Sequence, residues 1–216
     1  MTKKEKTAIT VTAICIILIV ASGILVYVKY NTPSTEKKDF EGMRVGDDIS
    51  LVEAVLLEAG QYKLEKADID MHETEEAFRN SFYYEDYLVD ISEGTVIYKI
   101  DEYILYGCNG RMALFFDSEN KLETAIFFMD EDEYGPDTVE EYTLAFESDY
   151  GKSAYFSPSG SLVRRYSTGH GQIRVEFFTV EHRCCIVFTN NSQDAFIHDG
   201  EMCIWRDQIW KEKDKE

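Results

Sequence analysis

The chain has 216 residues, and its 41 acidic and 22 basic side chains give a formal net charge of −19. Because this charge repels phosphate backbones, we expect no nucleic acid among the partners. A hydrophobic content of 44% with 13% aromatic residues excludes an intrinsically disordered chain, and only three prolines exclude collagen-like and proline-rich classes.

An uncharged, mostly apolar run covers residues 7–28 and follows a short basic tail of residues 1–6. A helix of this length, rising about 1.5 Å per residue, would cross the roughly 30 Å hydrocarbon core of a bilayer. Because lysines outnumber glutamate in the tail, the positive-inside rule places the N-terminus in the cytoplasm. The sequence therefore predicts a single-pass signal anchor in the cell membrane, with everything after it extracytoplasmic.

A cleaved signal peptide is the main alternative for this segment. Ala21-Ser22-Gly23 could serve as its small-residue cleavage site. The apolar run continues through residues 24–28, however, which a cleaved peptide does not need. Cys15 follows Ile14 in the middle of the run, which does not fit a lipidation signal, so we expect this cysteine to be buried in lipid.

A polar tether at residues 29–41 is expected to join the anchor to one exported domain at residues 42–216. Residues 37–216 carry 18 basic and 39 acidic side chains. Such a charge keeps a domain soluble at a crowded surface, which is the interpretation we favour; the alternative is attraction for cations or basic partners.

Two helices are predicted from capping signals within the exported domain. Ser50 and Glu53 form a capping box, and Gly60 is expected to stop the helix in a left-handed conformation. Thr138 begins a second helix in the same way, with Gly151 as its stop. A shorter helix is expected at residues 74–80.

Strands are predicted after each helix. Asn109-Gly110 is typical of a hairpin turn, and residues 172–178 alternate between apolar and other side chains, as in a strand with one buried face. Short turns between the strands indicate antiparallel pairing, and the repeated order of helix then strands predicts an α+β fold. The predicted strands cover residues 103–107, 111–116, 122–128, 162–166, 172–180 and 183–189.

Two stretches carry a resemblance to known families: MRVGDDISLVEAVLLEAG and YILYGCNGRMALFFDSENKLETAIFF. They resemble the helix-plus-antiparallel-sheet modules of β-lactamase-inhibitor-like proteins and of outer-membrane-assembly lipoproteins, through an entry glycine, a capped helix and a glycine-turn hairpin. The resemblance covers residues 42–190. The chain departs from it by having an anchor instead of a lipobox, and by a long insertion at residues 61–101. The resemblance implies a non-catalytic module that binds other proteins across its sheet.

An acidic segment, DEDEYGPDTVEE, follows the third predicted strand. Asp130, Asp132 and Glu141 occupy positions one, three and twelve of a twelve-residue calcium loop. Tyr134 stands where an oxygen ligand belongs, and a strand rather than a helix precedes the segment. The alternative is an acidic turn before a helix, whose positive dipole end favours carboxylates. We expect no resident metal or cofactor.

A group of arginines falls on three consecutive predicted strands and could form a cationic patch for a carboxylate or an anionic polymer. The alternative is cross-strand pairing with Glu176 and Glu181. The arginines are Arg164, Arg165, Arg174 and Arg183.

The cysteines beyond the anchor are Cys108, Cys184, Cys185 and Cys203. Adjacent residues of a strand point to opposite faces, so Cys184 and Cys185 should not pair with each other. Two disulfide pairings remain, in which Cys184 and Cys185 each bond either Cys108 or Cys203. The alternative is that all four cysteines stay reduced.

These features together predict a membrane-anchored, extracytoplasmic protein-binding or scaffolding module at the cell envelope, without catalysis. Its partner would be another envelope protein. Two alternatives stay open: an envelope hydrolase whose site no motif reveals, and a calcium-responsive surface domain.

Overall fold

A computed structural model describes residues 39–81, 94–156, 161–179, 181–190 and 199–211. The predicted tail, anchor and most of the tether lie outside these residues. Within the described ranges, no helix combines the length and the apolar composition that crossing a bilayer requires.

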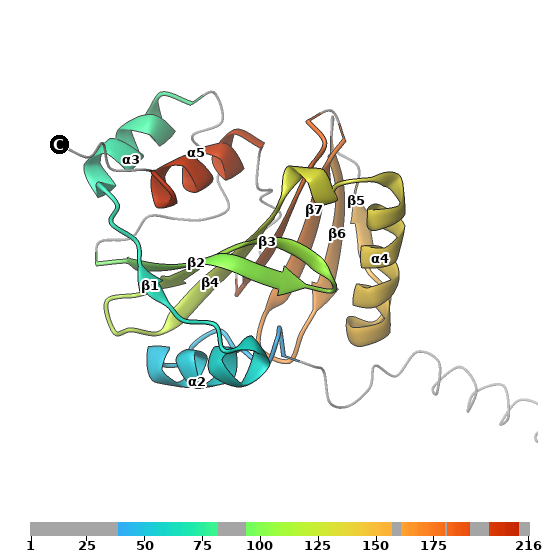
Figure 1. Cartoon of the computed structure of the whole chain (residues 1–216), viewed down its shortest axis with the longest axis horizontal. Coiled ribbons are helices and arrows are strands. Elements are labelled where there is room, and N and C mark those ends of the chain that lie inside the picture. The colour runs from blue at the N-terminus through green and yellow to red at the C-terminus, as the bar shows by residue number, and fades with distance from the viewer. Residues whose placement is uncertain (1–38, 82–93, 157–160, 180, 191–198, 212–216) are drawn as a thin grey trace, which may run out of the picture. The chain divides into compact units, whose positions relative to one another are not determined.

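The fold is α+β, as predicted, and its centre is one eight-stranded antiparallel sheet (Figure 1). The strands are β1 (Glu65–Lys66), β2 (Val96–Leu105), β3 (Cys108–Phe116), β4 (Leu122–Met129), β5 (Ala154–Phe156), β6 (Ser161–Ser167), β7 (Gln172–Phe178) and β8 (Arg183–Thr189). Their order is β1-β2-β3-β4-β8-β7-β6-β5, so the two halves of the sheet meet where β4 pairs with β8.

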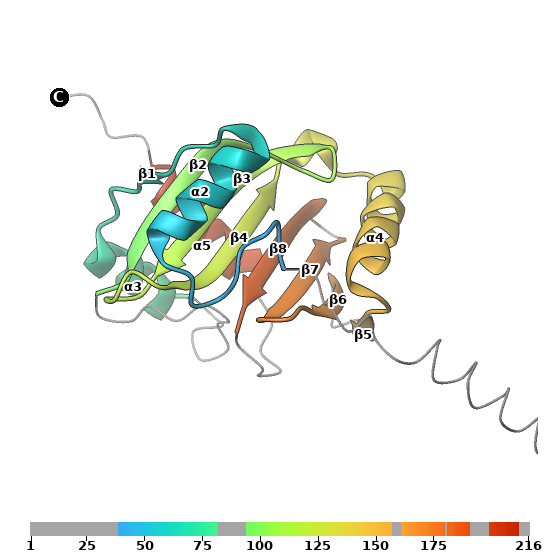
Figure 2. The same ribbon diagram turned by 90° about the horizontal axis from the view of Figure 1, so that it is seen from below.

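Helices cover both faces of the sheet. They are α2 (Ile49–Gly60), α3 (Met71–Arg79), α4 (Pro136–Tyr150) and α5 (Asp199–Ile209), with a short 3₁₀ turn, η2 (Glu131–Glu133), before α4. On one face α2 covers the first half of the sheet and α4 the second half (Figure 2). On the other face α3 and α5 pack together over the first half. The predicted α+β class with antiparallel strands is confirmed, while β1 and α3 lie between α2 and β2 and α5 follows β8, which the predicted pattern of two helix-then-strand units did not include.

The predicted capping box of α2 is wrong. Its N-cap is Asp48, without a side-chain cap, and Ser50 lies inside the first turn. The amide of Ile49 instead donates to the carbonyl of Asn120 at 3.1 Å, so the turn between β3 and β4 takes the place of a capping side chain. The left-handed residue that ends α2 is Gln61, with φ 58°, one position beyond the predicted glycine.

The start of α4 also differs from the prediction, while its end is confirmed. The helix begins at Pro136, whose fixed φ suits a first turn, and Gly135 precedes it as the N-cap. The hydroxyl of Thr138 donates to the carbonyl of Glu133 at 2.7 Å and does not cap the helix. Gly151, with φ 83°, follows the last residue as expected.

The β2–β3 hairpin turns at Tyr106 and Gly107, and the predicted turn at Asn109-Gly110 is wrong. Both turn residues have positive φ, 48° and 85°, as a two-residue type I′ turn requires. Gly110 instead lies within β3, where a Cβ would overlap the backbone oxygen of Phe128. That glycine permits a close approach between strands and does not form a turn.

The prediction of one buried face for β7 is wrong as well. Arg174 is 0% exposed and Glu176 is 2% exposed, although both alternate with the apolar residues of the strand. Phe177 and Phe178 pack in core clusters on opposite sides of the sheet, so both faces of β7 are covered.

The folded domain begins earlier than residue 42. Phe40 is fully buried and its ring lies 5.2 Å from that of Phe188. Asp39 accepts from Arg44 Nε at 2.7 Å and lies 2.9 Å from His170 Nδ1, in the turn between β6 and β7. These contacts fasten the end of the predicted tether to the second half of the sheet.

We expect the Asp39 contacts to make folding stability depend on pH. Burial alone would raise the pKa of Asp39, but hydrogen bonds from His170 and Arg44 and their charges outweigh it, so the pKa lies below its ordinary value. A depressed folded-state pKa stabilises the domain above the unfolded pKa of about 3.9, and this stability is lost as pH falls through the folded value.

The test is chemical denaturation of the full-length protein in mild detergent over a pH series. D39N should lower the free energy of unfolding at neutral pH and flatten its fall below about pH 4. If the free energy of unfolding of D39N falls with acid as steeply as that of the parent, the pH dependence comes from other carboxylates and the prediction is wrong.

Candidate binding groove

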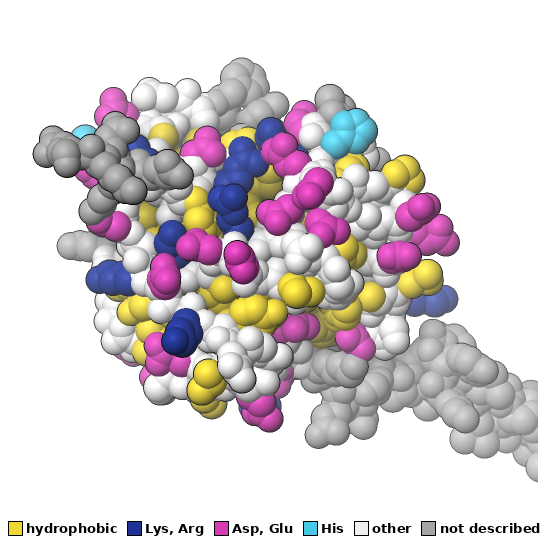
Figure 3. Space-filling model, in the orientation of Figure 1, with side chains coloured by type: hydrophobic (Ala, Val, Ile, Leu, Met, Phe, Trp, Pro, Cys, Tyr) yellow, Lys and Arg dark blue, Asp and Glu magenta, His cyan; other side chains and the backbone are white. Residues whose placement is uncertain are grey.

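An open groove lies where the end of α5 meets β3, β4 and η2. Its volume is about 740 Å³, within the roughly 300–1,000 Å³ of typical ligand sites. Basic and acidic side chains gather next to each other between α5 and the start of α4 (Figure 3). We call this feature the α5 groove, and it is lined by Arg111, Phe128, Met129, Asp130, Glu131, Asp132, Arg206, Asp207 and Trp210.

Burial of one face of α5 positions its contribution to the groove. Trp205 is fully buried, and its ring lies 4.8 Å from Phe115 on the sheet and 4.9 Å from Phe78 on α3. With that face fixed, Arg206 and Trp210, four residues apart, come to the same side of the helix end. The hydrophobic packing of α5 therefore presents a guanidinium and an indole together.

Trp210 is held in place from two sides. Its Nε1 donates to Asp101 Oδ1 at 2.7 Å, and its ring meets Phe128 edge-on with centroids 5.4 Å apart. Arg111 Cζ lies 5.8 Å from the centre of the indole, a cation–π arrangement worth about 0.5–1 kcal/mol at an exposed site. Within the described residues Arg111 makes no ion pair, so its guanidinium donors are available to a ligand.

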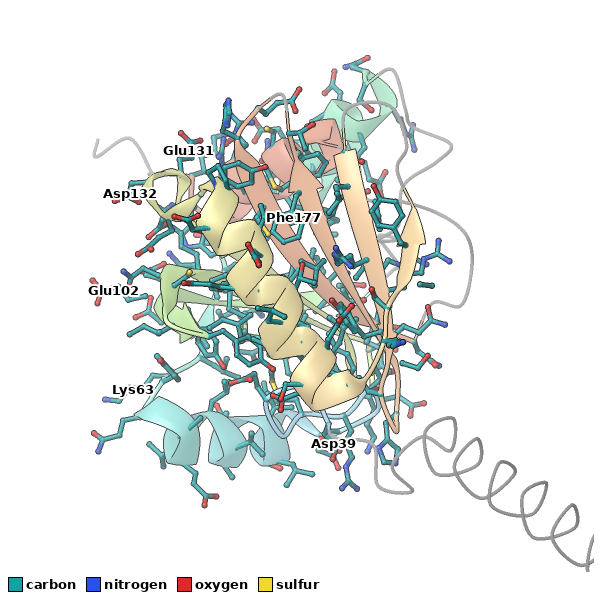
Figure 4. The ribbon with its side chains drawn as sticks, turned by 90° about the vertical axis from the view of Figure 1, so that its right-hand side faces the viewer. Asp39, Lys63, Glu102, Glu131, Asp132 and Phe177 are labelled. Carbon is teal, nitrogen blue, oxygen red and sulfur yellow. The ribbon has the colours of Figure 1, made fainter. Side chains whose placement is uncertain are left out.

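The opposite wall is the acidic turn η2, which β3 holds in place. The amide of Asp130 donates to the carbonyl of Asn109 at 3.1 Å. Asn109 in turn donates to Glu133 Oε1 from its backbone at 3.3 Å and from its side chain at 2.5 Å. Figure 4 shows Glu131 and Asp132 on this turn, far along α4 from Asp39.

Glu131 ties the acidic wall to the rest of the groove. Its Oε1 lies 3.3 Å from Arg183 Nε on β8 and 3.2 Å from Arg206 Nη1 on α5. Asp130 and Asp132 make no ion pair in the described part of the chain. Arg206 Nε also lies 3.5 Å from Asp207 Oδ1, so two guanidinium groups are balanced by two carboxylates. Beside this set lie carboxylates and a guanidinium that no described residue pairs.

The calcium candidates are only partly brought together. Asp130 and Asp132 line the α5 groove, whereas Glu141 lies on α4 and is not among the lining residues. Because α4 begins at Pro136, the second half of the twelve-residue calcium loop considered from the sequence, residues 130–141, is helical. The described residues contain no group of three or more His, Cys, Asp or Glu side chains that could hold a metal ion.

The arginine candidates do not form one surface patch. Arg165 and Arg174 are direct partners across β6 and β7, and Arg174 is fully buried. Arg164 points to the other face of the sheet, where its Nη1 lies 3.7 Å from Glu147 on α4. Arg183 instead joins the rim of the α5 groove through Glu131.

Arg111, Arg206 and Trp210 are among the groove residues that were not predicted from the sequence. A usable signal was present, because Met202, Trp205 and Ile209 recur at helical spacing in the C-terminal segment.

The structure records Cys108, Cys184, Cys185 and Cys203 as free thiols. Cys184 packs in the core cluster under α2 and α4, and Cys185 in the cluster under α3 and α5, which confirms that they point to opposite faces. Burial raises the pKa of Cys184 well above its ordinary value and also raises that of Cys108.

We expect thiol alkylation of the native, full-length protein to modify Cys184 and Cys185 after Cys108 and Cys203. The thiolate is the reactive form, Cys184 and Cys185 are 1% and 0% exposed, and burial also disfavours ionisation of Cys184. Peptide mass spectrometry after timed alkylation would rank the four sites, with the denatured protein as the control in which all react. A mass increase of the intact protein on reduction would instead reveal a disulfide and contradict free thiols.

Comparison with known proteins adds no relative: no family model, curated protein or solved structure matches this chain. The geometry of the α5 groove supplies guanidinium, carboxylate and indole groups around an apolar base, a combination suited to recognising another molecule.

Proposed function

We propose that this chain is a single-pass, membrane-anchored binding module of the cell envelope. Residues 7–28 anchor it, its N-terminus faces the cytoplasm, and its acidic α+β domain is displayed outside. The domain binds another envelope protein through the α5 groove and performs no catalysis.

The α5 groove is the observation that carries this proposal. Arginine and tryptophan are enriched at the energetic centres of protein interfaces, and here Arg111 and Trp210 lie together in a hollow with a charged rim. The ion pairs of Glu131 with Arg183 and Arg206 join β8, η2 and α5 into one rim. A rim built on a sheet and two helical elements favours recognition without prior rearrangement.

The partner test is site-specific photocrosslinking in living cells. A photoreactive amino acid at Asp207, whose side chain is 67% exposed at the groove rim, should give a discrete adduct with one envelope protein. The matched control position is Glu58, an exposed residue of α2. Adducts that are absent at both positions, or identical at both, would contradict binding through the groove.

The topology test uses protease added to intact cells. We expect digestion of the acidic domain while a small N-terminal fragment stays protected in the membrane. A domain that is cut only after the membrane is opened would reverse the proposed orientation.

A further inference from the structure

The two walls of the α5 groove present charges of opposite sign that the described residues leave without ion pairs. Arg111 stands on one wall, stacked 5.8 Å above Trp210. Asp130 and Asp132 stand on the other, on the turn at the end of β4. A bound group that neutralises only one wall would leave the other charge buried beside it, which is unfavourable.

Between the walls lie the rings of Phe128 and Trp210, which stand edge-on to each other. Phe128 is 3% exposed and supports the partly exposed indole, whereas Met129 packs in the core cluster on the opposite face of the sheet. The indole therefore offers a contact for an apolar or aromatic side chain, while both charged walls are held by backbone or ring contacts. Asp130 is fixed through the carbonyl of Asn109, and Trp210 through Asp101.

We infer that the α5 groove binds an extended peptide segment of mixed charge from a partner protein. A lysine or arginine of this segment contacts Asp130 and Asp132, an apolar side chain packs on Phe128 and Trp210, and a carboxylate accepts from Arg111. This inference rests on the proposed function and specifies the chemistry of its partner.

Charge complementarity favours this occupant over a second copy of the chain or an anionic polymer. Residues 37–216 carry 39 acidic and 18 basic side chains, so two copies repel each other, as do the domain and a polyanion. A partner that is basic overall is attracted over a longer range, and a carboxylate of the bound segment is then accommodated by Arg111.

The test titrates the full-length protein, in detergent, with short peptides blocked at both ends. The probe peptides carry two lysines, a phenylalanine and two aspartates, in that order and in the reverse order. Matched peptides carry glutamine for lysine or asparagine for aspartate. Binding is followed by calorimetry and by tryptophan fluorescence, which reports on the groove because Trp210 is partly exposed whereas Trp205 is fully buried.

We expect the mixed-charge peptide to bind and to change the fluorescence, with R111Q weakening it about tenfold, as for the loss of one charge-assisted hydrogen bond. The same substitution should not weaken the asparagine peptide further, and D132N should likewise have no effect on the glutamine peptide. Two control variants make the same charge changes outside the α5 groove: K63Q matches R111Q, and E58Q matches D132N. Figure 4 shows Lys63 away from Glu131 and Asp132. These controls should bind as the parent does.

The inference is overturned if no mixed-charge peptide binds at millimolar concentration, or if R111Q and K63Q weaken binding equally. It is also overturned if the peptide with asparagine in place of aspartate, which keeps only the lysine charges, binds as tightly as the mixed-charge peptide. In each of these cases a groove-specific photocrosslink at Asp207 would still support the proposed function, so the two failures can be told apart.

Discussion

Replacing Phe146 with alanine should lower the free energy of unfolding by about 3–5 kcal/mol, the range for a buried phenylalanine truncated to alanine. Phe146 on α4 is fully buried, and its ring centroid lies 4.8 Å from Tyr106, 5.7 Å from Tyr150 and 5.3 Å from Tyr166. Truncation would leave a cavity between α4 and the sheet. It would also remove ring contacts that fix the helix on β6 and on the β2–β3 turn.

The matched control for this prediction is Leu144 to alanine. Leu144 lies on the same helix but is 60% exposed, so its truncation should change stability by no more than about 0.5 kcal/mol. Chemical denaturation of the full-length protein in mild detergent measures both variants. Equal losses in the two would mean that α4 does not pack on the sheet through Phe146.

Replacing Gly110 with alanine should cost about 1–3 kcal/mol, the range for forcing extra volume into a packed interior. The added Cβ would overlap the backbone oxygen of Phe128 and lie 2.6 Å from the ring of Phe127. A backbone oxygen within a strand ladder cannot swing aside as a side chain can. β3 and β4 would therefore have to separate where they carry the base of the α5 groove.

Gly107, three residues earlier, provides a control with a different physical cause. Its φ is 85°, and no atom of the described residues lies within 4 Å of the position that a Cβ would take there. Alanine at this position should therefore cost only about 1 kcal/mol of backbone strain. Asparagine tolerates this conformation and should recover most of that loss at position 107. At position 110 asparagine should be at least as damaging as alanine, and a recovery there would contradict the steric explanation.

Several local features were predictable because a short stretch of sequence determines them. The apolar spacing in residues 49–60 indicates α2, and Gly151 ends α4 because a glycine readily adopts the positive φ found there. Opposite faces for Cys184 and Cys185 follow from the alternation of any strand. The acidic turn that contributes Asp130 and Asp132 to the α5 groove was recognised for the same reason.

Periodicity and turn residues act locally, so the amino-acid sequence alone was enough to predict the α+β class and the antiparallel pairing. Which side chains meet depends on the tertiary structure. Gly110 lies within β3 against the backbone of Phe128 while the turn falls at Tyr106 and Gly107, and the α2 start uses a carbonyl from Asn120. The pairing of β4 with β8 and the docking of α5 bring Arg183, Glu131 and Arg206 together. Such contacts join residues far apart in the chain, so no local pattern records them.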